Sequence, residues 1–270
     1  MQRGIYAATL TPVAPALDPD PAKAIPYYRD LLGRGCDGLN ILGTTGEAMS
    51  FSVEQRIAFM EAIASALPPD RISCGSGAAA LADAVRLTQA AIDLNFAAAL
   101  VMPPFFYRDV GDDGVVKFFD ALFSGVRAPE GRILLYNFPR MSGITFHAGL
   151  VDRLIREFPG TIVGMKDSSN DRALQRELLE RHEGLLVYPG SEQHLVEALS
   201  YGAAGCISGS VCLWPELAQE VYKTRDAAKG AELARLRGEL DGRPLIPAVR
   251  AATAAVRRDR TWELSPPPLG

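Results

Sequence analysis

Eight short runs of apolar and small residues recur along the chain, each bounded by glycine, proline or aspartate. They lie at residues 5–10, 38–42, 71–76, 96–102, 132–138, 161–166, 185–190 and 205–210. Each run is nearly continuous in apolar residues rather than alternating, which is typical of parallel strands covered on both faces. Segments with helical periodicity separate the runs. One of them begins after Ser52 and carries Gln55 three residues later, the spacing of a capping box.

This alternation predicts the fold. Strand and helix patterns that repeat eight times imply a parallel sheet, and eight units is the number that closes a barrel. We therefore expect an α/β protein, a (β/α)₈ TIM barrel over residues 1–212. Residues 213–270 show only helical patterns, with two helices or one helix interrupted near Gly230, then another, and a proline-rich end. This part is predicted to be a C-terminal helical extension of the catalytic barrel.

Composition narrows the range of partners. The chain has 270 residues, a net charge of −4 and 22% charged residues, which is ordinary for a soluble globular protein. No block of lysine and arginine stands out, so neither a nucleic acid nor a membrane is expected as a partner. The N-terminal residues do not resemble a signal peptide, which predicts a cytoplasmic protein. The four cysteines show no metal-binding spacing and are expected to be free, buried thiols.

Catalytic groups of such barrels lie at the C-terminal ends of the strands, and Lys166 is the candidate there. Four of the five lysines fall on predicted helices, whereas Lys166 ends an apolar strand. Lysine is rarely buried without a partner or a purpose. Burial in apolar surroundings lowers the pKa of an ammonium group, and a neutral amine can attack a ketone to form an electron-withdrawing iminium. If Lys166 is considered by itself, an ion pair with Asp167 or Glu192 explains its position at a strand end equally well.

Three other residues at predicted strand ends favour the nucleophile. Thr44 and Thr45 lie in a turn bounded by glycines, where hydroxyl and backbone N–H groups can bind the carboxylate of a 2-oxo acid. Tyr136 ends the neighbouring strand and can transfer protons beside the amine. Taken singly, the threonines fit a capped turn and Tyr136 fits a core aromatic residue. Their occurrence together at one barrel mouth favours a Schiff-base site.

Residues that other chemistries need are missing from the strand ends. The three histidines, at 147, 182 and 194, lie at or within predicted helices. A metal-dependent aldolase needs several His, Asp or Glu ligands at strand ends, and a Ser–His–Asp hydrolase needs a histidine there. No Walker or G-x-G-x-x-G motif occurs. We expect no metal and no organic cofactor, while GSE at 190–192 and SGS at 208–210 leave a phosphate site open.

With these residues in view, the chain resembles the dihydrodipicolinate synthase/N-acetylneuraminate lyase superfamily of class I, pyruvate-dependent aldolases. The resemblance runs from Gly4 to the proline-rich end. Its specific motifs stand in the family's order, and they are GTTGE (43–47), YNFP (136–139), GMKDSS (164–169) and GAAGCIS (202–208).

The resemblance implies a role for each candidate residue. Lys166 would form the imine with pyruvate, Tyr136 would act as acid and base, and Thr44 would belong to a proton relay. In the substrate site, Thr45 would bind the pyruvate carboxylate, Ile207 would line the pocket, and Gly190 would let the substrate approach. The resemblance also implies no cofactor beyond the lysine imine. It further implies a homotetramer built as a dimer of dimers.

The sequence departs from the dihydrodipicolinate synthase pattern at two places. Phe106 stands where those enzymes have a relay tyrosine, with Tyr107 one place further on. Met141 stands where they have an arginine that holds the carboxylate of the aldehyde substrate, with Arg140 one place earlier. These differences favour a lyase acting on a 2-oxo-3-deoxy sugar acid or related hydroxy-oxo acid. The alternatives are a 4-hydroxy-tetrahydrodipicolinate synthase of lysine biosynthesis and a non-catalytic 2-oxo acid sensor.

Overall fold

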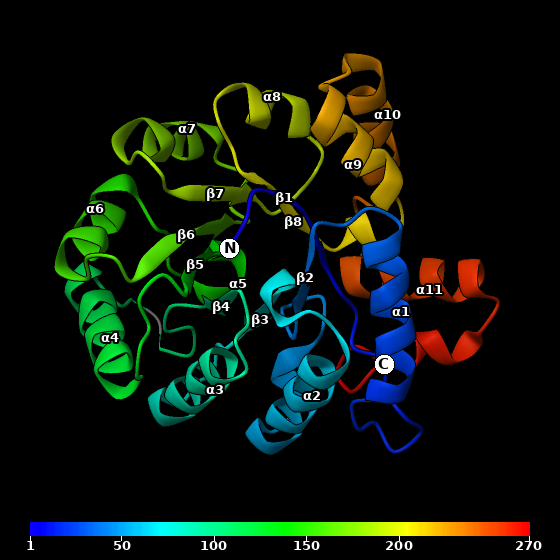
Figure 1. Ribbon diagram of the computed structural model, residues 1–270, viewed down its shortest axis with the longest axis horizontal. Coiled ribbons are helices and arrows are strands. Elements are labelled where there is room, and N and C mark those ends of the chain that lie inside the picture. The colour runs from blue at the N-terminus through cyan, green and yellow to red at the C-terminus, as the bar shows by residue number, and fades with distance from the viewer. Residues whose placement is uncertain (108) are drawn as a thin grey trace.

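The computed structural model describes residues 1–107 and 109–270. Within them, parallel strands pair side by side in the order β7-β6-β5-β4-β3-β2-β1-β8. The N–H of Ala204, the residue before β8, donates to the Val187 carbonyl of β7 (2.8 Å). The strands form a nearly closed ring inside a ring of helices (Figure 1). The predicted TIM barrel is confirmed. Its strands are β1 (Gly4–Ala8), β2 (Gly38–Ile41), β3 (Ile72–Gly75), β4 (Ala98–Val101), β5 (Ile133–Asn137), β6 (Ile162–Asp167), β7 (Leu186–Pro189) and β8 (Gly205–Ser208).

Helices follow the strands around the barrel. The predicted capping box is present at the start of α2, where Ser52 accepts from the Gln55 N–H (3.1 Å) and the Gln55 side chain accepts from the Ser52 N–H (2.8 Å). The surrounding helices are α1 (Pro21–Gly33), α2 (Val53–Ala66), α3 (Leu81–Asp93), α4 (Asp112–Gly125), α6 (Ala148–Glu157), α7 (Arg172–Arg181), α8 (Leu195–Ser200) and α9 (Pro215–Thr224). Short turns of helix at strand ends are η1 (Ala48–Ser50), α5 (Pro139–Ser142) and η3 (Ser210–Cys212), and η2 (Pro69–Arg71) precedes β3.

Side chains fill the inside of the barrel, because alternate residues of each strand point inward. This interior cluster includes Leu100, Leu134, Tyr136 and Ile207, all buried. At the N-terminal end of the barrel, the hydroxyls of Tyr6 and Tyr188 both donate to the carbonyl of Gln2, at 3.0 and 2.5 Å. These two hydrogen bonds help to fill the barrel at its N-terminal end, away from the end where the strands finish.

The C-terminal part contains α10 (Ala227–Gly238), α11 (Leu245–Arg257) and η4 (Arg260–Glu263). Of the two predicted arrangements before α11, two separate helices are confirmed, and a single helix interrupted near Gly230 is wrong. Helix α9 ends at Thr224, and the next residue, Arg225, has a φ of 59°. Asp226 then starts α10 by accepting from the N–H groups of Ala228 and Lys229. An aspartate at the N-cap stabilises a helix start, whereas Gly230 lies within α10. The division at residue 212 stays a prediction, and α9 packs directly on β1.

Helix α11 and the following segment return to the barrel beside α1 (Figure 1). Arg257 donates to Asp30 (2.6 Å), and Lys23 pairs with Asp259 (3.0 Å). These contacts connect the first helix of the barrel to the last part of the chain.

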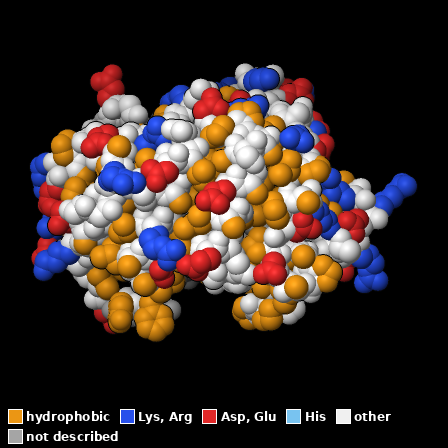
Figure 2. Space-filling view, turned by 60° about the horizontal axis from the view of Figure 1, so that its bottom comes forward, with side chains coloured by type: hydrophobic (Ala, Val, Ile, Leu, Met, Phe, Trp, Pro, Cys, Tyr) orange, Lys and Arg blue, Asp and Glu red, His pale blue; other side chains and the backbone are white. Residues whose placement is uncertain are grey.

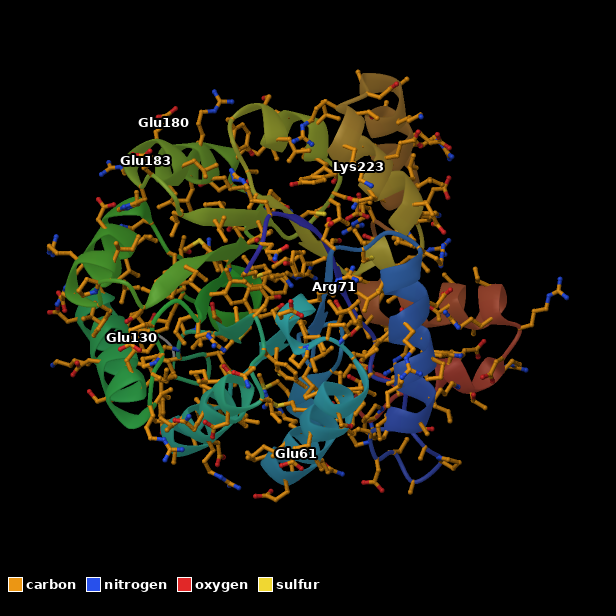
Figure 3. All side chains as sticks on the ribbon, in the orientation of Figure 1. Glu61, Arg71, Glu130, Glu180, Glu183 and Lys223 are labelled. Atoms are coloured by element: carbon orange, nitrogen blue, oxygen red, sulfur yellow. The ribbon has the colours of Figure 1, made fainter. Side chains whose placement is uncertain are left out.

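The outer surface carries mixed charges. Glu61 on α2 and Glu180 on α7 are exposed and lie on the outside of the helix ring (Figure 3). Acidic, basic and hydrophobic side chains are interspersed over the face that Figure 2 shows. Within the described residues, no helix is long and apolar enough to span a membrane.

Candidate functional site

Lys166 lies inside the barrel at the end of β6 and is only 4% exposed. It stands in register with Tyr136 of β5, and its Nζ is 4.6 Å from the centroid of the Tyr136 ring. Among the described residues, Lys166 forms no ion pair with Asp167, Glu192 or another carboxylate. The ion-pair explanation therefore has no support, and the amine faces an aromatic ring.

Asp167 points to the opposite side of β6, because successive residues of a strand alternate. Its buried carboxylate accepts hydrogen bonds from Asn137 (2.7 Å), the Ser169 hydroxyl (2.7 Å) and Gln175 (2.6 Å). Burial raises the pKa of Asp167, and these donors act in the other direction. The carboxylate joins the ends of β5 and β6 to α7, and so it fixes the backbone that carries Lys166.

Tyr136 connects Lys166 to the turn after β2. Its hydroxyl lies 3.1 Å from the Thr44 Oγ1, and either atom can be the donor. Tyr136 is 4% exposed and Thr44 is half-buried, so the pair lies at the edge between the barrel interior and the cavity. A hydroxyl that can both donate and accept, placed beside an amine, is suited to proton transfer. Lys166, Tyr136 and Thr44 thus lie together as the sequence predicts.

Of the predicted site residues, only Thr44 and Tyr136 line the cavity described below, and Lys166 lies behind the Tyr136 ring. The three predicted substrate-binding residues do not line it either. Thr45 is 7% exposed and packs on Gly209, where an added Cβ would come within 2.8 Å of the Thr45 hydroxyl. Ile207 is part of the barrel interior with Tyr136. A Cβ at Gly190 would meet the Ser168 Oγ at 2.2 Å, so this glycine permits close packing beside β6. The substrate-binding roles of Thr45, Ile207 and Gly190 stay predictions.

A cavity of about 340 Å³ opens at the barrel mouth, next to Thr44 and Tyr136. Phe105 and Met141 belong to its lining, whereas Phe106 and Tyr107 lie outside it. Phe106 and Tyr107 are each 71% exposed and pack edge to face, with centroids 5.4 Å apart. The remaining lining residues are Leu42, Gly43, Glu47, Ala48, Met49, Ser50, Gly75, Gly77, Leu100, Met102, Ile246, Pro268 and Leu269.

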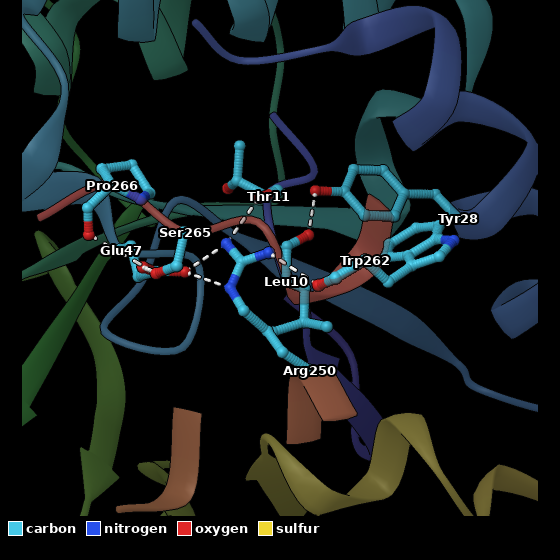
Figure 4. Close-up of polar contacts among 8 residues, drawn as sticks. All are labelled: Leu10, Thr11, Tyr28, Glu47, Arg250, Trp262, Ser265 and Pro266. Carbon is cyan, nitrogen blue, oxygen red and sulfur yellow. Dashed lines mark hydrogen bonds and ion pairs between the residues drawn. The ribbon is translucent and has the colours of Figure 1, made fainter. Parts of the chain in front are cut away.

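A buried ion pair beneath this cavity was not predicted. Arg250 of α11 donates from Nε to the Glu47 carboxylate (2.6 Å), and the two side chains are 2% and 1% exposed. Arg250 also donates to the carbonyls of Thr11 (2.9 Å) and Trp262 (3.3 Å), and Ser265 donates to Glu47 (Figure 4). Glu47 belongs to the same turn as Thr44, so the pair holds the C-terminal segment against that turn.

One sequence signal could have identified this pair. Arg250 is the only charged residue in the run 245–256, which is otherwise apolar or small apart from Thr253. A charge within such a run is usually paired when it is buried. The sequence does not say which carboxylate it meets, because Glu47 lies 203 residues away.

The histidines lie at helix ends, as predicted. His147 caps α6, His182 follows α7 and His194 precedes α8. Within the part of the chain that the structure describes, no three His, Cys, Asp or Glu residues are placed to hold a metal ion.

Comparisons with known proteins agree with this geometry. The model of the dihydrodipicolinate synthetase family matches residues 1–254. An uncharacterized DapA-like lyase of Chloroflexus aurantiacus is 34% identical over 93% of this chain and 85% of its own length. A 4-hydroxy-tetrahydrodipicolinate synthase of Symbiobacterium thermophilum is 27% identical over 84% of this chain and 77% of its own.

Solved structures show the same relationship. The dihydrodipicolinate synthase from Agrobacterium tumefaciens superposes with a TM-score of 0.92 at 30% identity, covering 100% of this chain and 93% of its own. The 2-keto 3-deoxygluconate aldolase from Picrophilus torridus gives a TM-score of 0.86 at 21% identity, covering 96% and 95%, and shows the shared fold. Fold, buried lysine and relatives together define a lyase, a class I pyruvate-dependent aldolase. The chain belongs to the dihydrodipicolinate synthetase family.

Proposed function

We propose that this protein catalyses the reversible aldol reaction of pyruvate with an aldehyde, through an imine on Lys166, to form or cleave a 4-hydroxy-2-oxo acid. The observation that carries the proposal is the contact of the buried Lys166 amine with Tyr136, whose hydroxyl meets Thr44. Such a set provides a nucleophile and a proton shuttle side by side.

In the first stage, the Lys166 Nζ adds to the C2 carbonyl of pyruvate and gives a carbinolamine. Proton transfer through the Tyr136 hydroxyl lets the carbinolamine lose water and leaves the iminium. Thr44 can hold the proton in transit, since its hydroxyl lies 3.1 Å from that of Tyr136. The iminium draws electrons from C3, so loss of a C3 proton yields the enamine.

In the second stage, the enamine C3 attacks the aldehyde carbon and forms the new carbon–carbon bond. The aldehyde oxygen takes up the proton, and the iminium returns. Water then hydrolyses the iminium, which frees Lys166 and releases the 4-hydroxy-2-oxo acid. Cleavage is the same sequence in reverse. The lysine imine serves as the electron sink, so we propose that no metal or organic cofactor is needed.

The aldehyde partner is the finer part of the proposal. Among the described residues, no Lys or Arg side chain lines the cavity, and Met141 lies there. An aldehyde with a second carboxylate would therefore find no cation in it. This supports a lyase for a hydroxy-oxo acid. Of the two substrate types that the sequence leaves open, the mostly apolar lining of the cavity favours a related hydroxy-oxo acid over a 2-oxo-3-deoxy sugar acid. The names of relatives that are 27% and 28% identical support the second candidate, 4-hydroxy-tetrahydrodipicolinate synthase.

Borohydride reduction in the presence of pyruvate tests the imine. We expect intact-protein and peptide mass spectrometry to show a pyruvate-derived adduct on Lys166. The variant Lys166→Ala should show none, whereas the matched control Lys223→Ala, which changes a helix residue, should be labelled like the original protein. An adduct that persists in Lys166→Ala would place the nucleophile elsewhere. An imine that no aldehyde can discharge would favour the sensor.

Quaternary structure and location are separate predictions. The expected homotetramer can be checked by light scattering coupled to size-exclusion chromatography, which measures the mass of the assembly. A monomeric mass would contradict it. The cytoplasmic location expected from the sequence can be checked by cell fractionation.

A further inference from the structure

The cavity beyond Tyr136 is mostly apolar, and the aldol chemistry does not by itself require this. Leu100 and Met102 come from the end of β4, and Met49 comes from η1. The far wall comes from the end of the chain, through Ile246 of α11 and the pair Pro268 and Leu269. Parts of the chain that are more than 140 residues apart in sequence thus form one hydrophobic chamber beside the catalytic tyrosine.

The polar groups of the lining are few. Its ionisable side chains, among the described residues, are Glu47 and Tyr136. The Glu47 carboxylate is already bound by Arg250 and Ser265, so its charge is compensated within the protein. Besides Tyr136 and Thr44, which face each other, Ser50 is the other hydroxyl. A chain of substrate hydroxyl groups would lose its water here with few protein partners, which is costly.

We propose that the acceptor is an aldehyde with an apolar substituent, aliphatic or aromatic, and that Pro268 and Leu269 form the wall against which this substituent packs. The inference rests on the proposed function, because the aldehyde carbon must meet the enamine on Lys166. The volume of about 340 Å³ is at the lower end of small-molecule sites, which are about 300–1,000 Å³. Such a chamber suits a compact substituent.

The wall is anchored and is not a loose end. Ser265, three residues before Pro268, is 7% exposed and donates to Glu47. The N–H groups of Leu269 and Gly270 both lie within hydrogen-bond distance of the Pro266 carbonyl, at 3.2 and 3.3 Å. A side chain on such an anchored turn can select substrates, because it keeps its place when the substituent binds.

The first test is an aldehyde series, with pyruvate and the full-length protein. We expect kcat/KM to rise about fourfold per methylene from acetaldehyde towards hexanal, until the cavity is full. Benzaldehyde should react better than acetaldehyde, and glyceraldehyde should react more slowly than butanal. A preference for glyceraldehyde or for aspartate semialdehyde over the apolar aldehydes would overturn the inference.

A matched pair of variants tests the wall. Leu269 and Leu264 are both partly exposed residues of the C-terminal segment, at 42% and 37%, but only Leu269 lines the cavity. We expect Leu269→Asn to lower kcat/KM for hexanal about tenfold and to leave glyceraldehyde almost unchanged. Leu264→Asn should leave both values unchanged. Equal effects of the two variants would contradict the wall, and Ile246→Asn provides a second test if Leu269→Asn does not fold.

Imine trapping separates the two proposals. Leu269→Asn should be labelled by pyruvate and borohydride as the original protein is, since Leu269 is not part of the Lys166 chemistry. A trapped imine combined with a preference for polyhydroxylated aldehydes would refute only the apolar acceptor. Failure to trap any imine in the folded original protein would refute both.

Discussion

Replacing Arg250 by methionine should strongly destabilise the protein. Methionine keeps much of the side-chain volume but removes the guanidinium. The Glu47 carboxylate, 1% exposed, would then keep only Ser265 as a side-chain partner, and the carbonyls of Thr11 and Trp262 would each lose a donor. Breaking a buried pair from one side costs about 3–5 kcal/mol. Each kcal/mol shifts the Tm of a chain of about this size by roughly 2–4 °C, so a fall of about 10 °C is expected.

The double variant Glu47→Gln/Arg250→Met gives the sharper test. It removes both charges, and replacing a whole buried pair is often neutral or stabilising. We therefore expect the double variant to be more stable than Arg250→Met alone by about 2–4 kcal/mol. The single change Glu47→Gln leaves the Arg250 charge with two carbonyl acceptors and should be destabilising as well.

Urea unfolding followed by far-UV circular dichroism measures these differences. The control is Arg86→Met, which removes an ion pair with Glu54 whose side chains are 52% and 70% exposed. Exposed pairs contribute little, so this variant should unfold close to the midpoint of the original protein. The reasoning fails if Arg250→Met is no worse than Arg86→Met. It also fails if the double variant recovers no stability.

Three further predictions follow from the same structure. Tyr136→Phe should lower turnover about 100-fold or more, because it removes the hydroxyl that meets Thr44, and the circular dichroism spectrum should not change. Near-normal turnover would exclude the proton shuttle. The four cysteines should resist thiol reagents until the protein unfolds, because they are buried, and burial raises the pKa of Cys74 to about 12 and that of Cys212 to about 11. Rapid labelling of the folded protein would contradict this. Hydrogen bonds from the Thr261 hydroxyl and from Lys23 lower the pKa of Asp259 from 3.8 to about 2. The ionised Asp259 carboxylate therefore stabilises the fold above pH 3.8, and this contribution is lost as the pH falls towards 2. Asp259→Asn should therefore lose less stability than the original protein between pH 4 and pH 2, as measured by the urea midpoint, and parallel pH profiles would be evidence against it.

Much of the barrel could be predicted because its signals are local. A buried parallel strand needs a short apolar run, and each of the eight runs overlaps an observed strand. The capping box of Ser52 and Gln55 needs only two residues at the right spacing. Two helices could be predicted in this part of the chain, but not the point where they divide, because the N-cap Asp226 determines the start of α10 more strongly than Gly230 interrupts it.

The sequence by itself determined the barrel, the position of Lys166 at a strand end and the presence of Tyr136 and Thr44 at the same mouth. Strand periodicity places all three without any knowledge of distant contacts. Only the tertiary structure decided that Lys166 faces the Tyr136 ring, that Arg250 meets Glu47, and that Leu269 lines the cavity. These contacts join residues that are far apart in the chain. Their partners are selected when the barrel closes and the C-terminal segment packs on it, because burial then requires each charge to be compensated and each apolar surface to be covered.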